Sequence, residues 1–256
     1  MVLAAGPGRR LGPLTSCSPK TLLPLSDQGS ILDVVLGNLK AVGIDQIAVV
    51  TGHHSGVIEK SVPHLERRHE ISLRLIFNPR FAECNNAYSL WCARELFSEG
   101  LILVNGDTVH PQLVEERLLA KDSTDVVLAV DRRKPVSVEA MKVRLSWHGS
   151  LDLITKDIDV GQAHGEYIGV ALIHPEAAGP LTSALERTWR RDPSLYYEDA
   201  FQELVHSGTQ IDTVVVDGTE WVEVDDSVDL ARARDLAGRY LAGAGPARPG
   251  PDIRRG

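Results

Sequence analysis

The chain has 256 residues, 43% of them hydrophobic, which is enough for a sizeable core, and its three cysteines are too few and too scattered for a disulfide framework or a zinc site. Its formal net charge of −8 argues against a nucleic acid or a membrane surface as partner, because both are anionic and attract basic faces. No apolar run reaches the roughly 18 residues of a membrane span, and no secretory signal pattern is visible, so we expect a cytoplasmic protein.

The first half of the sequence alternates between short apolar runs and amphipathic stretches. Residues 1–4 predict the end of a buried strand, and residues 6–20, rich in Gly, Pro, Ser and Arg, predict a loop. Ser30 is placed to cap a helix that Gly43 would end, and Pro63 is expected to interrupt another. The remaining elements expected here are helices over 30–42, 54–68, 86–97 and 111–121 and strands over 47–50, 73–77, 101–104 and 125–130.

The second half changes character at residues 142–155, which alternate like an antiparallel hairpin with its turn at 148–150. The elements that follow are a strand over 166–173, helices over 175–190 and 198–206, short strands over 211–216 and 221–224, and a closing helix over 227–241. Residues 243–256 have no apolar period and predict a disordered tail. Taken together, strands alternating with helices predict an α/β fold with a mixed, mostly parallel sheet flanked by helices.

Residues 3–25 (LAAGPGRRLGPLTSCSPKTLLPL) form the most informative segment. A strand that ends in a Gly-rich turn exposes backbone N–H groups to an anion, and Gly6 and Gly8 allow close approach of the backbone to phosphates. Arg9, Arg10 and Lys20 add positive charge to the same loop. The segment lacks the Lys-Ser/Thr ending of a P-loop and the third glycine of a Rossmann motif. The alternative is a polar surface loop with ordinary arginines.

Two carboxylates in other parts of the chain could accompany a bound phosphate. Asp107 follows an apolar strand, and the carboxyl end of a central parallel strand faces the crevice in which α/β proteins bind ligands. Carboxylates suit Mg²⁺, which also coordinates phosphate oxygens. The alternative for Asp107 is a turn or cap residue. A second carboxylate, Asp225, ends a late strand, and the adjacent Asp226 is placed to cap the helix that follows.

Residues 3–25 resemble the signature of nucleotidyltransferases that activate sugar 1-phosphates and related acceptors. The resemblance implies a Rossmann-like nucleotidyltransferase fold with a small antiparallel acceptor lid. It implies catalytic roles for Arg10, which would contact the triphosphate, and for Lys20, which would bridge the nucleotide and acceptor phosphates. It also implies Asp107 and Asp225 as ligands of a Mg²⁺ cofactor. The nucleotide-binding positions that it implies in these segments are Leu3, Ala4, Ala5, Gly6, Gly8, Arg9 and Gly106.

Two features of the segment depart from that signature. Pro7 lies within the turn and fixes φ there. The first strand is also shorter than is usual in the family, which suggests that the N-terminus is truncated.

Residues 83–90 (ECNNAYSL) resemble a segment of the small bacterial cytidylyltransferases of the phosphocholine and phosphonate type, and residues 195–199 (LYYED) resemble a second one. The resemblance implies that Asn85 and Ser89 lie near the cytosine and ribose of CTP. An asparagine at this place also suits a helix N-cap, and the two interpretations are compatible.

The acceptor is less defined. The resemblance implies contacts from the lid region, although each of these residues is more commonly a surface or packing residue: Lys142, Lys156, Glu166, Tyr196 and Glu198. Two acceptor chemistries stay open. A quaternary ammonium would require an aromatic or acidic cage, for which Tyr196, Tyr197, Trp221 and Glu198 are available. A carboxylated phosphonate would require cations, for which Arg132, Arg133, Lys134 and Lys142 are available.

The sequence thus predicts a Mg²⁺-dependent enzyme that transfers CMP from CTP to a small phosphate or phosphonate acceptor and releases pyrophosphate. We expect one domain over 1–242, with 1–131 mainly binding the nucleotide and 132–225 mainly binding the acceptor. Two alternatives remain: a sugar-1-phosphate nucleotidylyltransferase that uses UTP, dTTP or GTP, and a non-catalytic nucleotide-binding regulatory module. A homodimer is a reasonable expectation for an enzyme of this kind.

Overall fold

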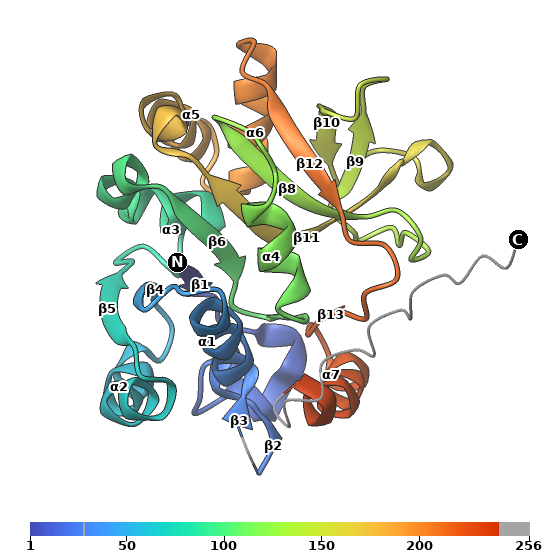
Figure 1. Cartoon of the computed structure of the whole chain (residues 1–256). Helices are drawn as coiled ribbons and strands as arrows, with labels where there is room; N and C mark the ends of the chain where they lie inside the picture. Colours follow the sequence, from blue (N-terminus) through green and yellow to red (C-terminus); the bar gives the residue numbers. More distant parts are fainter. Residues whose placement is uncertain (28, 241–256) are drawn as a thin grey trace, which may run out of the picture.

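The computed structural model describes residues 1–27 and 29–240, so the predicted tail at 243–256 lies outside the described residues. Its centre is a mixed sheet of nine strands, seven of which lie side by side (Figure 1). Six of these seven run in the same direction and only β11 is antiparallel to its neighbours, which confirms the predicted mixed, mostly parallel sheet. In spatial order the seven are β5 (Ser72–Phe77), β4 (Gln46–Thr51), β1 (Val2–Ala4), β6 (Leu101–Asn105), β11 (Gly165–Ile173), β8 (Val126–Asp131) and β12 (Ile211–Val215).

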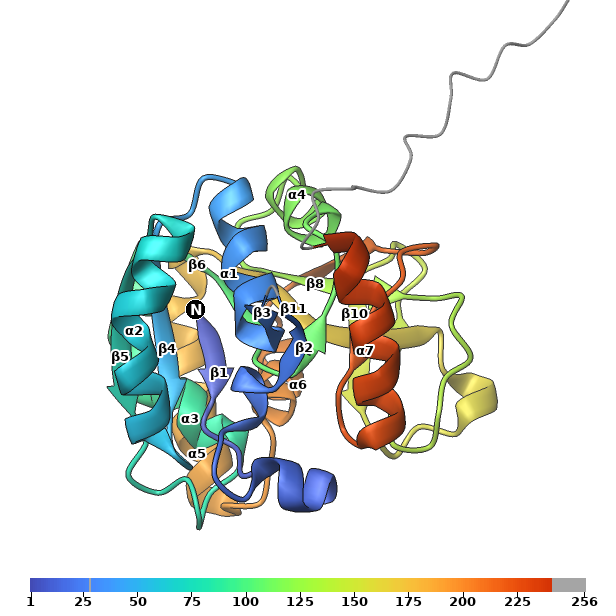
Figure 2. The ribbon, with the colours of Figure 1, turned by 90° about the horizontal axis from the view of Figure 1, so that it is seen from below.

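Helices cover the sheet on both sides (Figure 2). One apolar core forms where α1 (Ile31–Ala41), α2 (Ser55–His69) and α4 (Leu113–Leu119) pack on one face of the strands. A second core forms on the opposite face, against α3 (Asn86–Cys92), α5 (Ala178–Arg191) and α6 (Tyr197–His206). Burial on both faces explains why the central strands are apolar throughout rather than alternating.

The helix limits follow local capping chemistry. Ser30 caps α1 as predicted: its hydroxyl accepts from the Asp33 N–H, and the Asp33 carboxylate accepts from the Ser30 N–H at 2.8 Å. The predicted interruption at Pro63 is wrong, because α2 runs through this exposed position, where water can replace the lost backbone bond. The helix predicted over 86–97 is in fact α3 followed by a 3₁₀ turn, η3 (Arg94–Glu99).

The second half contains the predicted hairpin, formed by β9 (Lys142–Leu145) and β10 (Leu151–Thr155), which continues the sheet from the start of β11. Two small ribbons lie apart from the main sheet. One pairs β2 (Pro24–Ser26) with β3 (Gly29–Ser30) and was not predicted. The other pairs β7 (Thr108–Val109) with β13 (Val222–Glu223).

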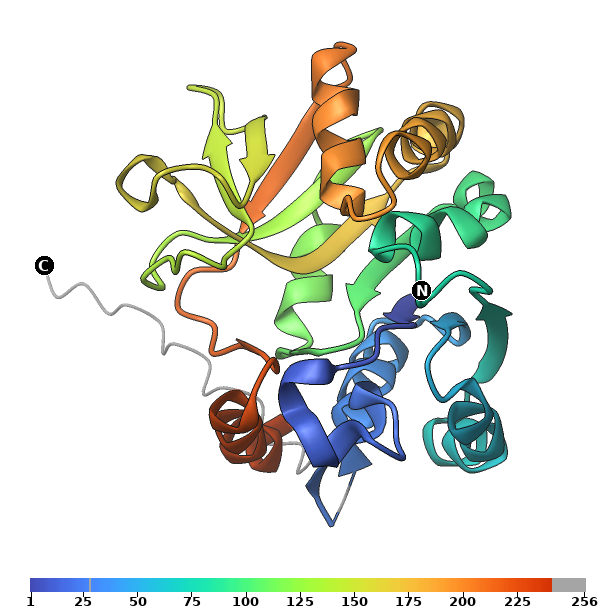
Figure 3. The ribbon, with the colours of Figure 1, turned by 180° about the vertical axis from the view of Figure 1, so that it is seen from behind.

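The closing helix α7 (Ser227–Tyr240) packs beside the N-terminal loop, as Figure 3 shows from behind. Leu11 and Leu23 share an apolar cluster with Leu230 and Ala233, and Arg234 Nε donates to the Pro24 carbonyl at 3.2 Å. The closing helix therefore packs against the loop that follows β1. The described residues include no helix with the length and hydropathy needed to cross a membrane.

Candidate active site

The chain leaves β1 through a loop that folds back on itself through η1 (Arg9–Thr15). Gly8 has a φ of 60°, and a Cβ there would lie 3.1 Å from Thr15 and 3.2 Å from Lys20. The Thr15 hydroxyl donates to the Gly8 carbonyl at 3.0 Å, and the Leu11 N–H donates to the same carbonyl at 3.1 Å. A side chain at Gly8 would be strained and would push Lys20 away, so this glycine sets the place of the lysine.

Lys20 lies at the centre of a cluster of opposite charges. Its Nζ is 2.7 Å from Asp107 Oδ2 and 3.2 Å from Asp225 Oδ1, and Arg10 Nη2 is 2.7 Å from the same Asp225 oxygen. Burial by itself lowers the pKa of Lys20, but the two carboxylates outweigh it and the pKa is raised. The lysine is therefore a cation at neutral pH. The structure thus brings together the residues predicted to be catalytic and those predicted to bind the metal.

Backbone pairing explains how two carboxylates 118 positions apart in the sequence meet. The Gly106 N–H donates to the Leu3 carbonyl at 2.9 Å, and a Cβ on Gly106 would lie 2.5 Å from that oxygen. Directly after this turn, the ribbon of β7 and β13 begins, and the Val224 N–H donates to the Asp107 carbonyl at 2.9 Å. Asp107 and Asp225 therefore flank the same ribbon.

Glu223 is a third carboxylate of this cluster that the sequence analysis missed. Oxygens of Asp107, Glu223 and Asp225 lie within 4.8 Å of one another. Glu223 is an exposed residue, but protein surrounds its carboxyl group and Asp107 and Asp225 add negative charge nearby, so its pKa is raised. The signal was present in the sequence, because a two-residue period in Glu223-Val224-Asp225 places both carboxylates on one side of the strand and Val224 on the other.

These three side chains fit a hard divalent cation. Carboxylate oxygens are the ligands that Mg²⁺ takes from proteins, usually beside phosphate oxygens of the substrate. The cluster already accepts positive charge in the structure, because Lys20 and Arg10 both lie against it. The Asp226 carboxylate, in contrast, accepts from the N–H groups of Val228 and Asp229, which is the predicted helix cap.

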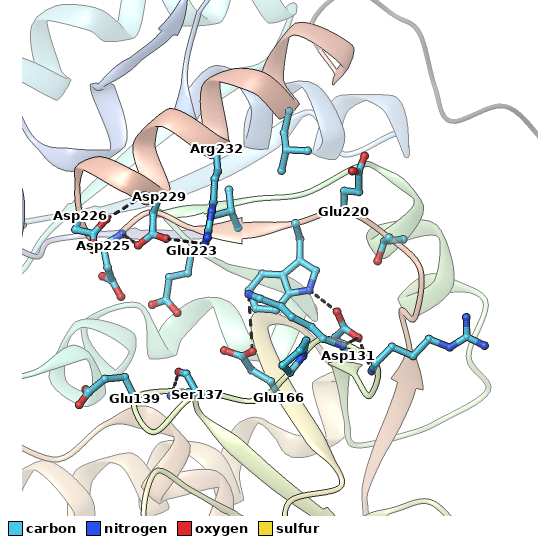
Figure 4. Close-up of a pocket in the computed structure, with 18 of the residues that line it drawn as sticks. Asp131, Ser137, Glu139, Glu166, Glu220, Glu223, Asp225, Asp226, Asp229 and Arg232 are labelled. Atoms are coloured by element: carbon cyan, nitrogen blue, oxygen red, sulfur yellow. Dashed lines mark hydrogen bonds and ion pairs between the residues drawn. The ribbon is translucent and has the colours of Figure 1, made fainter. Parts of the chain in front are cut away.

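A cavity of about 830 Å³ opens next to the cluster, between α7, the segment 133–140 and the first residues of β11. In Figure 4, Glu223 and Asp225 point into the space that Glu166 faces from the other side. Arg10 and Trp221 also line it. Of the residues predicted to contact the acceptor, Glu166 is therefore in place.

The other predicted acceptor residues do not line this cavity. Lys142 is buried, and its ammonium donates to the backbone carbonyls of Val138 and Lys156, both at 2.6 Å, so it holds the lid together instead of facing a ligand. Lys156 Nζ lies 4.7 Å from the ring centroid of Tyr196. Glu198 is buried, and this burial raises its pKa to about 7.

A smaller cavity of about 320 Å³ lies on the other side of the Gly-rich loop. Arg9 lines this cavity whereas Arg10 lines the larger one, so neighbouring arginines serve different cavities. His53 and Phe81 form part of its wall and were not predicted. The signal for His53 was its position two residues after β4, at the same edge of the sheet as the Gly-rich loop.

Asn85 and Ser89, which were predicted to contact the nucleoside, form hydrogen bonds with other residues of the protein. Asn85 caps α3, with Oδ1 accepting from the Asn86 N–H and Nδ2 donating to the Ser194 carbonyl, both at 2.8 Å. The Ser89 hydroxyl accepts from Asn78 Nδ2 at 2.9 Å. Leu3 and Ala4 belong to the central strand, whereas Ala5 and Gly6 follow it, and a Cβ on Gly6 would meet no protein atom within 4 Å. The open side of the loop is therefore at Gly6.

Comparison with known proteins supplies the family. A profile of the MobA-like NTP transferase domain matches residues 1–204. Over 251 residues the chain is 29% identical to a CMP-5'-(3-aminopropyl)phosphonate synthase of Streptomyces rubellomurinus, a match that covers 91% of this chain and 38% of the relative. It is 30% identical to a choline-phosphate cytidylyltransferase of Streptococcus pneumoniae over 40% of this chain and 42% of the relative. The chain thus matches less than half the length of each of these relatives.

Among solved structures, the inositol-1-phosphate CTP transferase from T. maritima resembles this chain with a TM-score of 0.80 and 21% identity, covering 96% of both chains. At this identity the similarity supports the fold alone.

Proposed function

Because this chain belongs to the MobA-like NTP transferase family, we propose that it transfers CMP from CTP to a small phosphate or phosphonate acceptor and releases pyrophosphate. The observation that carries this proposal is the position of Lys20, which contacts two carboxylates at the boundary between the Gly-rich loop and the larger cavity. Arg10, bound to the same Asp225 oxygen, adds a second cation at this boundary.

The reaction requires charge neutralisation and alignment more than proton transfer. An oxygen of the acceptor phosphate or phosphonate attacks the α-phosphorus of CTP, a new P–O bond forms, and the bond to the β-phosphate oxygen breaks, so that pyrophosphate leaves with the electron pair. The acceptor oxygen is already anionic at neutral pH, so no general base is required. Lys20 and Arg10 reduce the repulsion between the two anions and hold them in line.

Asp107, Asp225 and Glu223 are the residues that would hold Mg²⁺. When bound, such a cation stabilises negative charge that develops on the phosphate oxygens. In this assignment the backbone of the Gly-rich loop binds phosphate oxygens and the smaller cavity receives the nucleoside. Residues 1–131 then serve mainly the nucleotide and residues 132–225 mainly the acceptor.

The preference for CTP is supported by the relatives, since both curated relatives described above carry names that refer to cytidine nucleotides. The resemblance of residues 83–90 to a cytidylyltransferase segment points the same way. Because Asn85 and Ser89 both have hydrogen-bond partners within the protein, we propose that they act by holding the start of α3 in place and do not contact the base.

The test is a pyrophosphate-release assay with Mg²⁺ that pairs CTP, UTP, GTP, ATP or dTTP with each of several acceptors. The acceptors are phosphocholine, 2-aminoethylphosphonate, 2-hydroxyethylphosphonate, phosphonoformate, inositol 1-phosphate and glucose 1-phosphate. We expect release only with CTP and only when an acceptor is present. Turnover of UTP or dTTP with glucose 1-phosphate would instead assign the chain to the sugar nucleotidylyltransferases. Tight CTP binding without release from any acceptor would identify a nucleotide-binding module.

A further inference from the structure

Asn105 is a polar residue at the end of an otherwise apolar strand, β6. Its backbone lies beside Leu3 of β1, the strand that leads into the Gly-rich loop. Because two residues of extended chain span about 7 Å at most, the Cα atoms of Asn105 and Asp107 lie within that distance. The Asn105 side chain therefore starts next to the boundary at which Lys20 contacts the carboxylates.

A buried tyrosine holds one end of the Asn105 amide. Side chains alternate along a strand, so Asn105 lies on the same face of the sheet as Leu103, which packs in the core against α3, α5 and α6. On this face the Tyr197 hydroxyl of α6 donates to Asn105 Oδ1 at 3.0 Å. Tyr197 is fully buried, so close packing keeps its hydroxyl in place.

A second tyrosine fixes the direction of this hydrogen bond. The Tyr197 hydroxyl lies 3.1 Å from the Tyr167 hydroxyl of β11. Burial raises the pKa of both phenols, so each keeps its hydrogen at neutral pH. Because a phenol has one hydrogen, Tyr197 accepts from Tyr167 when it donates to Asn105. Only the oxygen of an amide accepts a hydrogen bond, so the oxygen end of Asn105 faces Tyr197.

The nitrogen end of the amide has no partner among the described residues. No described residue accepts from Asn105 Nδ2, and this nitrogen is not enclosed by protein, so water reaches it. Gly169 of β11 leaves room for it, because φ there is 79° and a Cβ would lie 2.6 Å from Asn105 Nδ2. The pairing of β11 with β8 is irregular at this place, and such irregularities are common beside active sites.

We propose that Asn105 is a further catalytic residue, whose side-chain N–H donates to an α-phosphoryl oxygen of the bound nucleotide, and that Tyr197 is the positioning residue that holds the amide in this orientation. The proposal rests on the proposed function, in which the α-phosphoryl group lies at the boundary because the acceptor attacks it there. Preorganised amide donors stabilise negative charge on such oxygens as the reaction proceeds. Asn105 thus adds a neutral donor beside the cation Lys20.

Asn105→Asp separates a donor role from a structural one. Aspartate keeps an oxygen that accepts from Tyr197 but replaces the N–H groups with a second acceptor. With the most active acceptor of the panel, we expect Asn105→Ala to lower kcat/KM for CTP about 10²-fold. Asn105→Asp should lower it further, because a carboxylate repels phosphoryl oxygens. An asparagine that only supports Tyr197 would tolerate aspartate better than alanine, and that order would overturn the proposal.

Tyr197→Phe tests the positioning role, since it keeps the buried ring and removes the hydroxyl. We expect kcat/KM for CTP to fall about fivefold in the wild-type background and not at all in the Asn105→Ala background, because the amide that Tyr197 positions is then absent. Tyr88→Phe is the matched control. Its ring packs against Trp91 and Trp189, and the substitution should leave kcat/KM unchanged. Equal losses from Tyr197→Phe in both backgrounds would show that Tyr197 does not act through Asn105.

Binding without turnover separates this proposal from the function on which it rests. CTP should be titrated calorimetrically, with Mg²⁺, into the wild-type protein, Asn105→Ala and Asn105→Asp, with Tm as the check on folding. We expect Kd to rise about tenfold for the alanine variant and further for the aspartate variant. If no acceptor releases pyrophosphate, the proposed function fails, and these affinities still decide the role of Asn105. Equal affinities, or no CTP binding by any of the three, would contradict it.

Discussion

The two cavities beside the Gly-rich loop are built in different ways. The smaller one is lined by residues from 7–16, His53 and 81–82. Beside it, Gly52 lets two backbone segments approach closely, since a Cβ there would lie 2.7 Å from the Ala5 carbonyl oxygen. The larger one is lined by charged side chains from segments that extend from Arg10 to Leu236. The comparison teaches that one side of the site is specified by backbone geometry and the other by charges that the fold brings together.

Lys20 and the metal cluster lie where the two sides meet. The carboxylates come from the ends of β6 and β13, and Lys20 comes from the Gly-rich loop. If the comparison is correct, variants in this boundary should affect catalysis itself. Variants on either side should affect folding or the binding of one substrate.

Loss of a carboxylate at the boundary should have the largest effect on kcat. Asp107→Asn and Asp225→Asn should each lower kcat about 10³-fold, because each removes a cation ligand and a partner of Lys20. The dependence on Mg²⁺ should shift to higher concentration. Asp226→Asn is the matched control, since the Asp226 carboxylate caps α7 and does not belong to the three-carboxylate cluster. Near-normal turnover of either variant at saturating Mg²⁺ would show that the carboxylate cluster is not required for the reaction.

The close backbone approach at Gly106, next to the boundary, predicts an effect on folding. In Gly106→Ala, the new Cβ would lie 2.5 Å from the Leu3 carbonyl oxygen, and a strand backbone cannot give way as a flexible side chain would. We expect a loss of unfolding free energy of about 1–3 kcal/mol, seen as a lower Tm in thermal unfolding. Gly37→Ala, in α1 with no atom within 4 Å of the new Cβ, should leave Tm unchanged or raise it. Equal Tm for Gly106→Ala and wild type would show that this close approach is not required.

Substitutions of the two neighbouring arginines should have the smallest effects, and they distinguish the two sides of the site. Arg9→Ala should raise KM for CTP about tenfold. Arg10 contacts Asp225 at the boundary, so Arg10→Ala should lower kcat about tenfold; each variant loses one charge-assisted contact. Steady-state kinetics with both substrates varied would distinguish them. If the two variants gave the same pattern, the arginines would not serve different cavities.

The difference between the two sides of the site also explains which of its residues could be predicted from the sequence. Asp107, Asp225, Arg10 and Lys20 were predicted because they stand in short segments with a recognisable order, and the central strands because burial on both faces makes them continuously apolar. The acceptor side was predicted less well. Lys142 carries a charge but is buried among backbone carbonyls, and no local pattern reveals that. Lys134 and Trp221, in contrast, meet only through the tertiary fold.

Glu223 and Pro63 show two further limits. Glu223 stands two positions before Asp225, a spacing that the sequence alone contains, so this omission was avoidable. The effect of Pro63 depends on whether its turn of α2 faces water, which the fold decides.

The central claim is that Lys20 joins the two sides of one catalytic site, and Lys20→Met tests it most directly. Initial rates of pyrophosphate release should be measured with CTP and the best acceptor, both saturating, beside a Lys60→Met control, which removes the same charge from the exposed face of α2. The account predicts a fall in kcat of at least about 10²-fold, with Tm and CTP affinity little changed. Near-normal kcat for Lys20→Met would contradict the account.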